Sequence, residues 1–308
     1  MESKILTIFL HLFVIIVAPP FFVGVINRVK SIFAGRKGPP ILQLYFDVFK
    51  LLRKGAVYSK STSQVFRMVP MIMLACVIFA GVLFPFTGSG LVGFWGDAIL
   101  FVYLFALARF AIISAALDTG SSFEGMGASR EATFGAFAEL TVFIVIITLA
   151  VITRSLSLNG IFMWDGGHFA LEPATILLFL AFFFILLTEN SRMPIDDPNT
   201  HLELTMIHEV MVLDYSGPDL GIVLYGASVK LFIFMAFAST LICPNTWHGP
   251  VVTTGILMIK VLIVAILIGV VESVTARIRL IKIPQSLIAA FVLSLFGLVV
   301  AVFARGVL

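Results

Sequence analysis

The chain has 308 residues, of which 60% are hydrophobic and only 12% carry a charged side chain. Soluble domains carry about 25% charged residues, so this composition excludes an ordinary water-soluble fold. The two cysteines, Cys76 and Cys243, lie in apolar runs and are too few for a disulfide framework or a four-thiolate iron–sulfur site. The sequence therefore predicts a single polytopic, all-α integral membrane domain over residues 1–308.

About eight transmembrane helices are expected, since a helical span takes about 20 apolar residues. Their hydrophobicity is continuous instead of alternating, which excludes lipid-facing β-strands. The first run has no basic segment before it and no small-residue cleavage site after it, so we expect a retained helix. The predicted spans cover residues 5–26, 66–86, 97–117, 131–153, 172–189, 220–243, 251–275 and 284–304.

The distribution of Lys and Arg predicts the orientation of these helices. Only Lys4, Arg154 and Arg305 fall on one side of the predicted bilayer. Loops rich in Lys and Arg stay in the cytoplasm, so the opposite side is predicted to be cytoplasmic and both termini to be outside. The excess of basic residues then indicates the orientation of the protein in the membrane and a docking surface for a partner, and it does not indicate a nucleic-acid-binding patch. Fourteen residues fall on the cytoplasmic side: Arg28, Lys30, Arg36, Lys37, Lys50, Arg53, Lys54, Lys60, Arg67, Arg130, Arg192, Arg277, Arg279 and Lys282.

The first inner loop predicts a short amphipathic helix over residues 42–54. Residues 35–40 contain two glycines and two prolines, which break the preceding helix. Gln43, Asp47, Lys50 and Lys54 then follow at spacings of four, three and four, which gives one polar stripe. At about 20 Å this helix is too short to span. It either lies in the membrane surface, or closes a cavity and presents Asp47 and Lys50 to a soluble partner.

Ionisable side chains near or within the predicted spans are the next signal. Each costs about 3 kcal/mol or more in a bilayer unless it is paired or hydrated. Glu131 and Glu139 are eight residues apart, so on one helix they lie about 12 Å and some 80° from each other and can face one polar interior. Static pairing with Arg109 is one interpretation and an ion relay is the other. The number of such groups favours the relay: Arg109, Asp118, Glu131, Glu139, Lys230, Lys260 and Glu272.

The third inner loop is the densest in chemistry, with seven carboxylates and two histidines within residues 189–219. Pro194 and Pro198 predict a non-helical entry, and the apolar pattern of 199–213 is compatible with a helix. His201 and His208 have no third nitrogen or sulfur ligand at helical spacing, which argues against a metal site. The segment favours a quinone or ion-entry cavity lined by carboxylates near the inner surface.

Three inner-loop motifs together resemble a known family. Gly38-Pro39 with the helix after it, and Glu189-x-x-Arg192-x-Pro194-x-Asp196 with Glu203, look like the membrane subunit 1 family of respiratory complex I. The run from Asp118-Thr-Gly-Ser-Ser-Phe to Gly127-Ala-Ser-Arg130-Glu131 more closely resembles the homologous subunit of formate hydrogenlyase and related group 4 membrane-bound NiFe hydrogenases. The resemblance covers nearly the whole chain and includes the eight-helix plan with both termini outside.

The resemblance implies a subunit of the cytoplasmic (inner) membrane of a prokaryote that anchors a soluble redox arm and begins the ion path. Arg130, Glu139, Glu189, Arg192, Asp196 and Glu203 match family positions, and Asp214-Tyr215-Ser216-Gly217 looks like the family's Glu-Tyr-x-Gly segment. Asn199 and His201 stand where the family usually has glutamates, and the stretch from Glu203 to Asp214 is about three residues longer. These departures favour a divergent hydrogenase-type branch over a NADH:quinone enzyme.

We therefore expect a non-catalytic subunit of an oxidoreductase complex. It binds no cofactor of its own, while Fe–S clusters and a NiFe centre are on partner subunits. The expected partners are hydrogenase-like large and small subunits, Fe–S subunits and antiporter-like membrane subunits. The candidate ion pathway comprises Glu131, Glu139, Glu189, Asp196, Glu203, Lys230, Lys260 and Glu272, and the candidate docking residues are Arg36, Lys37, Asp47, Lys50, Arg130, Arg192 and Asp214.

Three alternatives stay open at this stage. One is a quinone-site subunit of a complex I-like NADH or ferredoxin:quinone oxidoreductase, with a quinone between the first and third inner loops. Another is a stand-alone ion transporter, although the sequence shows none of the internal duplication typical of that class. The last is a purely structural anchor with no ion flow.

Overall fold

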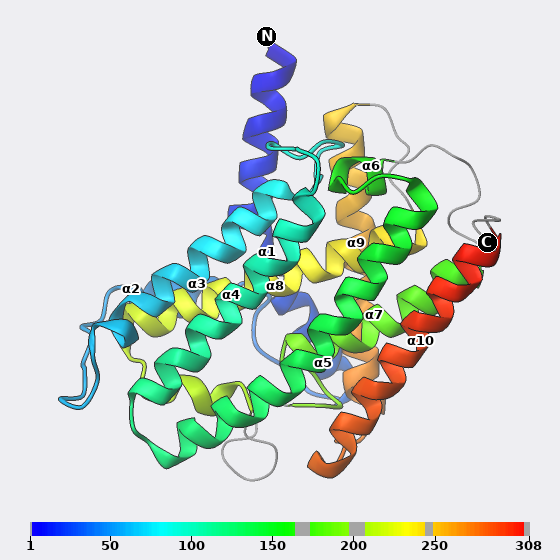
Figure 1. Ribbon diagram of the computed structural model, residues 1–308. Coiled ribbons are helices and arrows are strands. Elements are labelled where there is room, and N and C mark those ends of the chain that lie inside the picture. Colours follow the sequence, from blue (N-terminus) through cyan, green and yellow to red (C-terminus); the bar gives the residue numbers. More distant parts are fainter. Residues whose placement is uncertain (1, 164–172, 197–206, 244–248, 305–308) are drawn as a thin grey trace.

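A computed structural model describes residues 2–163, 173–196, 207–243 and 249–304 of the chain (Figure 1). Within these ranges the regular structure is helical throughout, and no residue of the described part is in a strand. The prediction of an all-α membrane protein is confirmed. The amino-terminal end of α1 and the carboxyl-terminal end of α10 both lie in the upper half of Figure 1.

Seven helices of the described chain are long and apolar enough to cross a bilayer, and α7 (Pro173–Glu189) is a shorter apolar helix. Each of the eight predicted ranges overlaps one of these helices. Two helices extend well beyond their apolar runs, because backbone hydrogen bonding continues past the lipid-length segment that hydropathy detects. The seven are α1 (Glu2–Phe33), α3 (Gln64–Leu83), α4 (Asp97–Asp118), α5 (Ser122–Thr153), α8 (Gly217–Ile242), α9 (Pro250–Val274) and α10 (Ile283–Ala304).

Besides α2 (Gln43–Leu52), the described residues contain three short elements. α6 (Leu158–Phe162) follows α5, and the 3₁₀ turns η2 (Glu209–Val212) and η3 (Leu280–Lys282) precede α8 and α10. The side chain of Asp97, at the start of α4, accepts the backbone N–H of Leu158 at 2.6 Å. This hydrogen bond fixes α6 to the end of the bundle where α4 begins.

The short helix of the first inner loop is α2 (Gln43–Leu52), in which no residue is fully buried. Two residues of its predicted polar stripe contact each other, since the Gln43 side-chain amide donates a hydrogen bond of 2.8 Å to the Asp47 carboxylate. Tyr45 donates its hydroxyl hydrogen to the Val17 carbonyl of α1, and Phe46 and Phe49 are exposed. At about 15 Å, α2 is too short to span and lies beside α8 and α1.

The sequence pattern is compatible with a helix over residues 199–213. The structure describes residues 207–213 of this range, and there the backbone is not an α-helix. Residues 207–213 contain only the 3₁₀ turn η2 and no turn of α-helix. Val210 and Met211 pack so closely on Gly127 of α5 that a Cβ there would lie 2.2 Å from Val210 Cγ1. The backbone follows the surface of α5 at this point, since that contact buries both apolar side chains.

Phenylalanine rings fill the end of the bundle where α4 begins and α8 ends. The Phe237 ring lies 4.4 Å from Phe182, 5.0 Å from Phe162 and 6.1 Å from Phe101, centroid to centroid. These four rings come from α4, α6, α7 and α8, and all four side chains are almost completely buried. The packing of these rings makes this part of the interior largely apolar.

Replacement of Gly24 by alanine should destabilise the protein. A Cβ at Gly24 would lie 1.8 Å from the Ile41 carbonyl oxygen, so α1 and the segment before α2 would have to separate, at a cost of about 1–3 kcal/mol. Gly255 is the matched control, because it lies inside α9 with nothing within 4 Å of its Cβ position. Thermal unfolding in detergent should show a lower Tm for Gly24→Ala only, and an unchanged Tm would contradict this contact.

Candidate functional site

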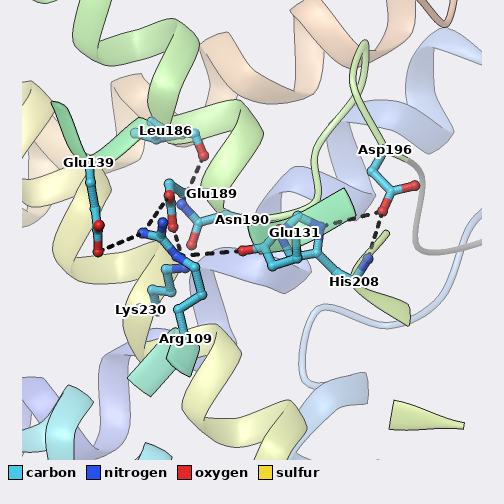
Figure 2. A network of polar contacts seen from close by, with 9 residues as sticks. All are labelled: Arg109, Glu131, Glu139, Leu186, Glu189, Asn190, Asp196, His208 and Lys230. Atoms are coloured by element: carbon cyan, nitrogen blue, oxygen red, sulfur yellow. Dashed lines mark hydrogen bonds and ion pairs between the residues drawn. The ribbon is translucent and has the colours of Figure 1, made fainter. Parts of the chain in front are cut away.

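Arg109 lies at the centre of a buried network of charged side chains (Figure 2). Its guanidinium, on α4, is 2.9 Å from Glu189 Oε1, 3.6 Å from Glu131 Oε1 and 3.7 Å from Glu139 Oε1. Only 9% of the Arg109 side chain is exposed. A planar guanidinium has five donors in a fixed fork, which suits it to hold three carboxylates from two other helices.

One face of α5 is shaped to receive this guanidinium. Glu131, Gly135 and Glu139 follow one another at intervals of four residues, which brings them to the same side of the helix. A Cβ at Gly135 would lie 2.2 Å from Arg109 Nη1, so the guanidinium rests against the bare helix backbone between the two glutamates. Both glutamates therefore face one polar interior.

Glu189 is the last residue of α7, and the turn after it positions its carboxylate. The backbone N–H of Arg192 donates to Leu187 O at 2.9 Å and that of Ser191 to Thr188 O at 3.4 Å, and Ser191 has a φ of 52°. This is a Schellman-type helix end. A carboxylate is disfavoured at the negative end of a helix. Two cations offset that cost, since Lys230 Nζ of α8 lies 2.7 Å from Glu189 Oε2, in addition to Arg109.

His208 links this cluster to the turn that follows α7. Its Nε2 is 3.2 Å from Glu131 Oε2 and its Nδ1 is 3.4 Å from Asp196 Oδ2. Burial lowers the pKa of the imidazole, but the carboxylates of Glu131 and Asp196 outweigh it and hold the pKa of His208 above its ordinary value. Arg277 Nη2, from the link after α9, is 3.5 Å from Asp196 Oδ1.

The contacts therefore form one continuous row from Asp196 through His208, Glu131 and Arg109 to Glu139, as Figure 2 shows. The Glu139 side chain is 31% exposed, so this end of the row reaches the surface of α5. A space of about 20 Å³, enough for about one water molecule, lies between Arg109, Glu139, Glu189 and the phenylalanines. The carboxylates and His208 can exchange protons with each other or through such a water, whereas Arg109 stays charged and holds the carboxylates in place.

The remaining candidate pathway residues lie elsewhere. Glu272 of α9 forms a second cluster, with Lys30 Nζ at 2.8 Å and Arg192 Nη1 at 3.5 Å. Lys260 donates to the Cys243 carbonyl at 2.6 Å, far along α9 from Glu272. The predicted residue Glu203 lies outside the described residues. The fold thus brings together Glu131, Glu139, Glu189, Asp196 and Lys230 and separates Glu272 and Lys260 from them.

The candidate docking residues differ in their exposure. Arg36 and Lys37 are exposed in the loop after α1, and Lys50 is exposed at the end of α2. Asp214 is also exposed, and its backbone N–H donates to Glu124 Oε1 at 3.0 Å. In contrast, Arg192 is buried against Glu272, so its side chain lies beneath the surface. Asp47 and Arg130 are partly buried.

Three residues of the site were not among the pathway or docking candidates that the sequence suggested. Arg109 figured only as a static partner, and Arg277 only as a sign of topology. His208 was weighed for a metal and set aside. The density of carboxylates around it was the signal that could have identified it. Among the residues that the structure describes, no group of three or more His, Cys, Asp or Glu side chains is arranged to hold a metal ion.

Comparisons with known proteins agree on one family. Hydrogenase-4 component C of Escherichia coli K12 is 28% identical over 86% of this chain and 85% of the relative. Formate hydrogenlyase subunit 4 of the same organism is 28% identical over 90% of this chain and 92% of the relative. A subunit of the NADH-quinone oxidoreductase of Bordetella avium is 26% identical over 70% of this chain and 62% of the relative.

A solved structure shares the fold. The match is to a chain of the membrane-bound sulfane sulfur reductase, described as an archaeal respiratory membrane complex, with a TM-score of 0.84 and 19% identity over 96% of this chain and 99% of that one. The family model described as NADH dehydrogenase matches residues 4–303, which is nearly the full length. The chain therefore belongs to the NADH dehydrogenase family, the subunit 1 family of complex I.

Proposed function

We propose that this chain is the membrane anchor and an ion-pathway subunit of a membrane-bound hydrogenase or formate hydrogenlyase-like respiratory complex. The observation that carries the proposal is the continuous row of ionisable side chains from Asp196 to Glu139. The names of the two relatives that match most of the chain support the hydrogenase branch. Protons are the simplest ion for such a row, because carboxylates and an imidazole relay them by changing protonation.

The two ends of the row suggest how it is connected. Asp196 follows α7 in the loop predicted to face the cytoplasm, where a redox partner would sit. The phenylalanines around Phe237 close the opposite end of the interior, and Glu139 is exposed at the side of α5. Protons or their electrostatic effect would thus pass sideways to a neighbouring membrane subunit of antiporter type.

The inner loops would form the docking surface for the soluble arm. Arg36, Lys37 and Lys50 are exposed cations there, and Asp214 is an exposed carboxylate on the segment before α8. With both termini outside, these residues face the cytoplasm of a prokaryotic cell. Hydrogenase-like large and small subunits and Fe–S subunits would bind here and carry the Fe–S clusters and the NiFe centre.

Electron transfer in the partner subunits would act on the row through charge. Reduction of a partner subunit's Fe–S cluster close to Asp196 would add negative charge near this carboxylate and raise the affinity of Asp196 for a proton. The added proton can pass through His208 to Glu131, and from there between carboxylates by way of water, since Arg109 itself stays charged. The reciprocal effect of protonation on the Fe–S cluster couples the two events. Arg277 would moderate this effect, since it holds Asp196 at 3.5 Å.

The test is purification of the complex through a tag on this chain, followed by reconstitution in liposomes. We expect hydrogenase-like and Fe–S subunits to co-purify, and a pH gradient to form when hydrogen is evolved or oxidised. A complex that turns over hydrogen in sealed liposomes with no ion movement would contradict the ion-pathway role. Recovery of the chain without redox subunits would contradict the anchor role.

A quinone-site subunit is the second candidate. The relative that belongs to an NADH-quinone oxidoreductase favours it, as does the exposed aromatic surface of α2 around Phe46 and Phe49. Quinone reduction by the purified complex that quinone-site inhibitors block would support this alternative. An intact set of nickel-ligating cysteines in the co-purified large subunit would instead support the hydrogenase.

A further inference from the structure

The buried cluster around Arg109 holds more carboxylates than fixed cations. Glu131, Glu139 and Glu189 carry three negative charges when ionised, whereas Arg109 and Lys230 carry two positive charges. An unbalanced charge in a low-dielectric interior is costly, so such a cluster holds a proton in place of the missing cation. His208 is the next group in contact, at 3.2 Å from Glu131.

The imidazole of His208 faces a carboxylate with each of its two nitrogens. Nδ1 lies toward Asp196 at 3.4 Å and Nε2 toward Glu131 at 3.2 Å, and these two carboxylates come from different segments of the chain. The backbone N–H of His208 also donates to Asp196 Oδ2 at 3.2 Å, which fixes the ring beside that carboxylate. Nε2 forms no hydrogen bond in this arrangement, so its contact with Glu131 is an ion-pair distance that favours an imidazolium, which carries a hydrogen on both nitrogens.

We propose that His208 is the proton-transferring residue that joins Asp196 to the buried cluster, and that its proton balances the third carboxylate of that cluster. The inference rests on the proposed ion-pathway role and names one residue that joins its two parts. His208 contacts both Asp196, in the turn after α7, and Glu131, in the buried cluster.

The transfer balances in protons and involves no electrons. A proton on Asp196 Oδ2 moves to Nδ1 of the neutral ring, so one O–H bond breaks and one N–H bond forms. The imidazolium then releases its Nε2 proton to Glu131 Oε2, so that N–H bond breaks and an O–H bond forms. Rotation of the ring, whose side chain is 19% exposed, then turns its remaining N–H away from Asp196 and presents the unprotonated nitrogen to that carboxylate, so the ring can accept the next proton.

The surroundings of the ring favour its charged form. Glu131 of α5 and Asp196 of the turn are the groups in contact, and both raise the pKa of the imidazole. Lys230 of α8 acts on it in the opposite direction, and Glu189 of α7 is close enough to interact with it. Because the carboxylates outweigh Lys230 and burial, His208 should stay protonated to a higher pH than a free histidine and still titrate.

The experiment compares His208→Gln with wild type in the intact complex, reconstituted in liposomes. Glutamine keeps a polar side chain at this position but has no titratable nitrogen. We expect the ratio of ion movement to redox turnover to fall on the order of 100-fold, as for loss of a positioned acid–base group. In wild type this ratio should change with pH above 6.5, where the imidazole titrates, and in His208→Gln this step should be absent.

His11→Gln is the matched control, because His11 is a buried histidine whose Nε2 contacts the Gly81 carbonyl at 3.1 Å and no carboxylate. Its coupling ratio and pH profile should equal those of wild type. If the wild-type complex moves ions and His208→Gln keeps the same ratio and the same pH profile, the role of His208 is refuted while the ion pathway stands. If the wild-type complex itself moves no ions, the proposed function fails first.

Discussion

Replacement of Arg109 by leucine is expected to be the most destabilising single change in this protein. It would leave Glu131, Glu139 and Glu189 without their shared cation in a mostly buried site. Removal of one partner of a buried ion pair costs about 3–5 kcal/mol, because the other charge stays buried without compensation. Three carboxylates depend on Arg109, so Arg109→Leu should lower both the amount of protein in the membrane and the Tm in detergent.

Two further variants distinguish loss of charge from loss of geometry. Arg109→Lys keeps a positive charge but lacks the planar fork, so we expect an intermediate Tm. The double variant Arg109→Leu with Glu189→Gln removes one orphaned carboxylate and should recover part of the loss, which a double-mutant cycle measures. A wild-type Tm for Arg109→Leu would mean that the three carboxylates are protonated or hydrated and do not depend on Arg109.

Glu139→Gln is expected to impair ion coupling without loss of assembly. The Glu139 carboxylate pairs with Arg109 at 3.7 Å and its side chain is 31% exposed, so its loss should change stability by less than about 1 kcal/mol. Its carboxylate nevertheless forms the exposed end of the charged row, and glutamine cannot bind or release a proton there. The ratio of ion movement to redox turnover in liposomes should fall about tenfold or more.

The controls for Glu139→Gln separate charge from position. Glu139→Asp keeps a titratable carboxylate and should retain part of the coupling. Asp219→Asn removes a carboxylate at the start of α8, outside the row and outside the candidate docking residues, and should leave ion coupling unchanged. Wild-type coupling in Glu139→Gln would remove Glu139 from the mechanism.

Both predictions depend on features that the sequence reveals to different degrees. The spacing of Glu131 and Glu139 on one helix predicts that the two carboxylates face one interior, since helix geometry is local and regular. Arg109 is visible in the sequence as a costly charge within a span. Its three partners are not visible, because Glu131, Glu139 and Glu189 lie on helices whose rotation and depth relative to α4 are set by packing.

Gly135 and His208 illustrate the same limit. A glycine inside a helix reads as a weak point in the sequence, yet here it makes room for the Arg109 guanidinium, which would be 2.2 Å from a Cβ. His208 lacks metal-ligand spacing, which gives it no motif of its own. Its role depends on Asp196 and Glu131, which are 12 and 77 residues away along the chain.

The sequence by itself determined the membrane class, the helical spans and the amphipathic α2, because hydropathy and helical periodicity follow from residues within one or two turns of each other. Only the tertiary structure decided which charges meet: Arg109 with three glutamates, and Glu272 with Lys30 and Arg192 in a separate cluster. The physical reason is that a buried charge must find its counter-charge across helix interfaces. Those interfaces are fixed by the packing of apolar side chains far apart in the chain.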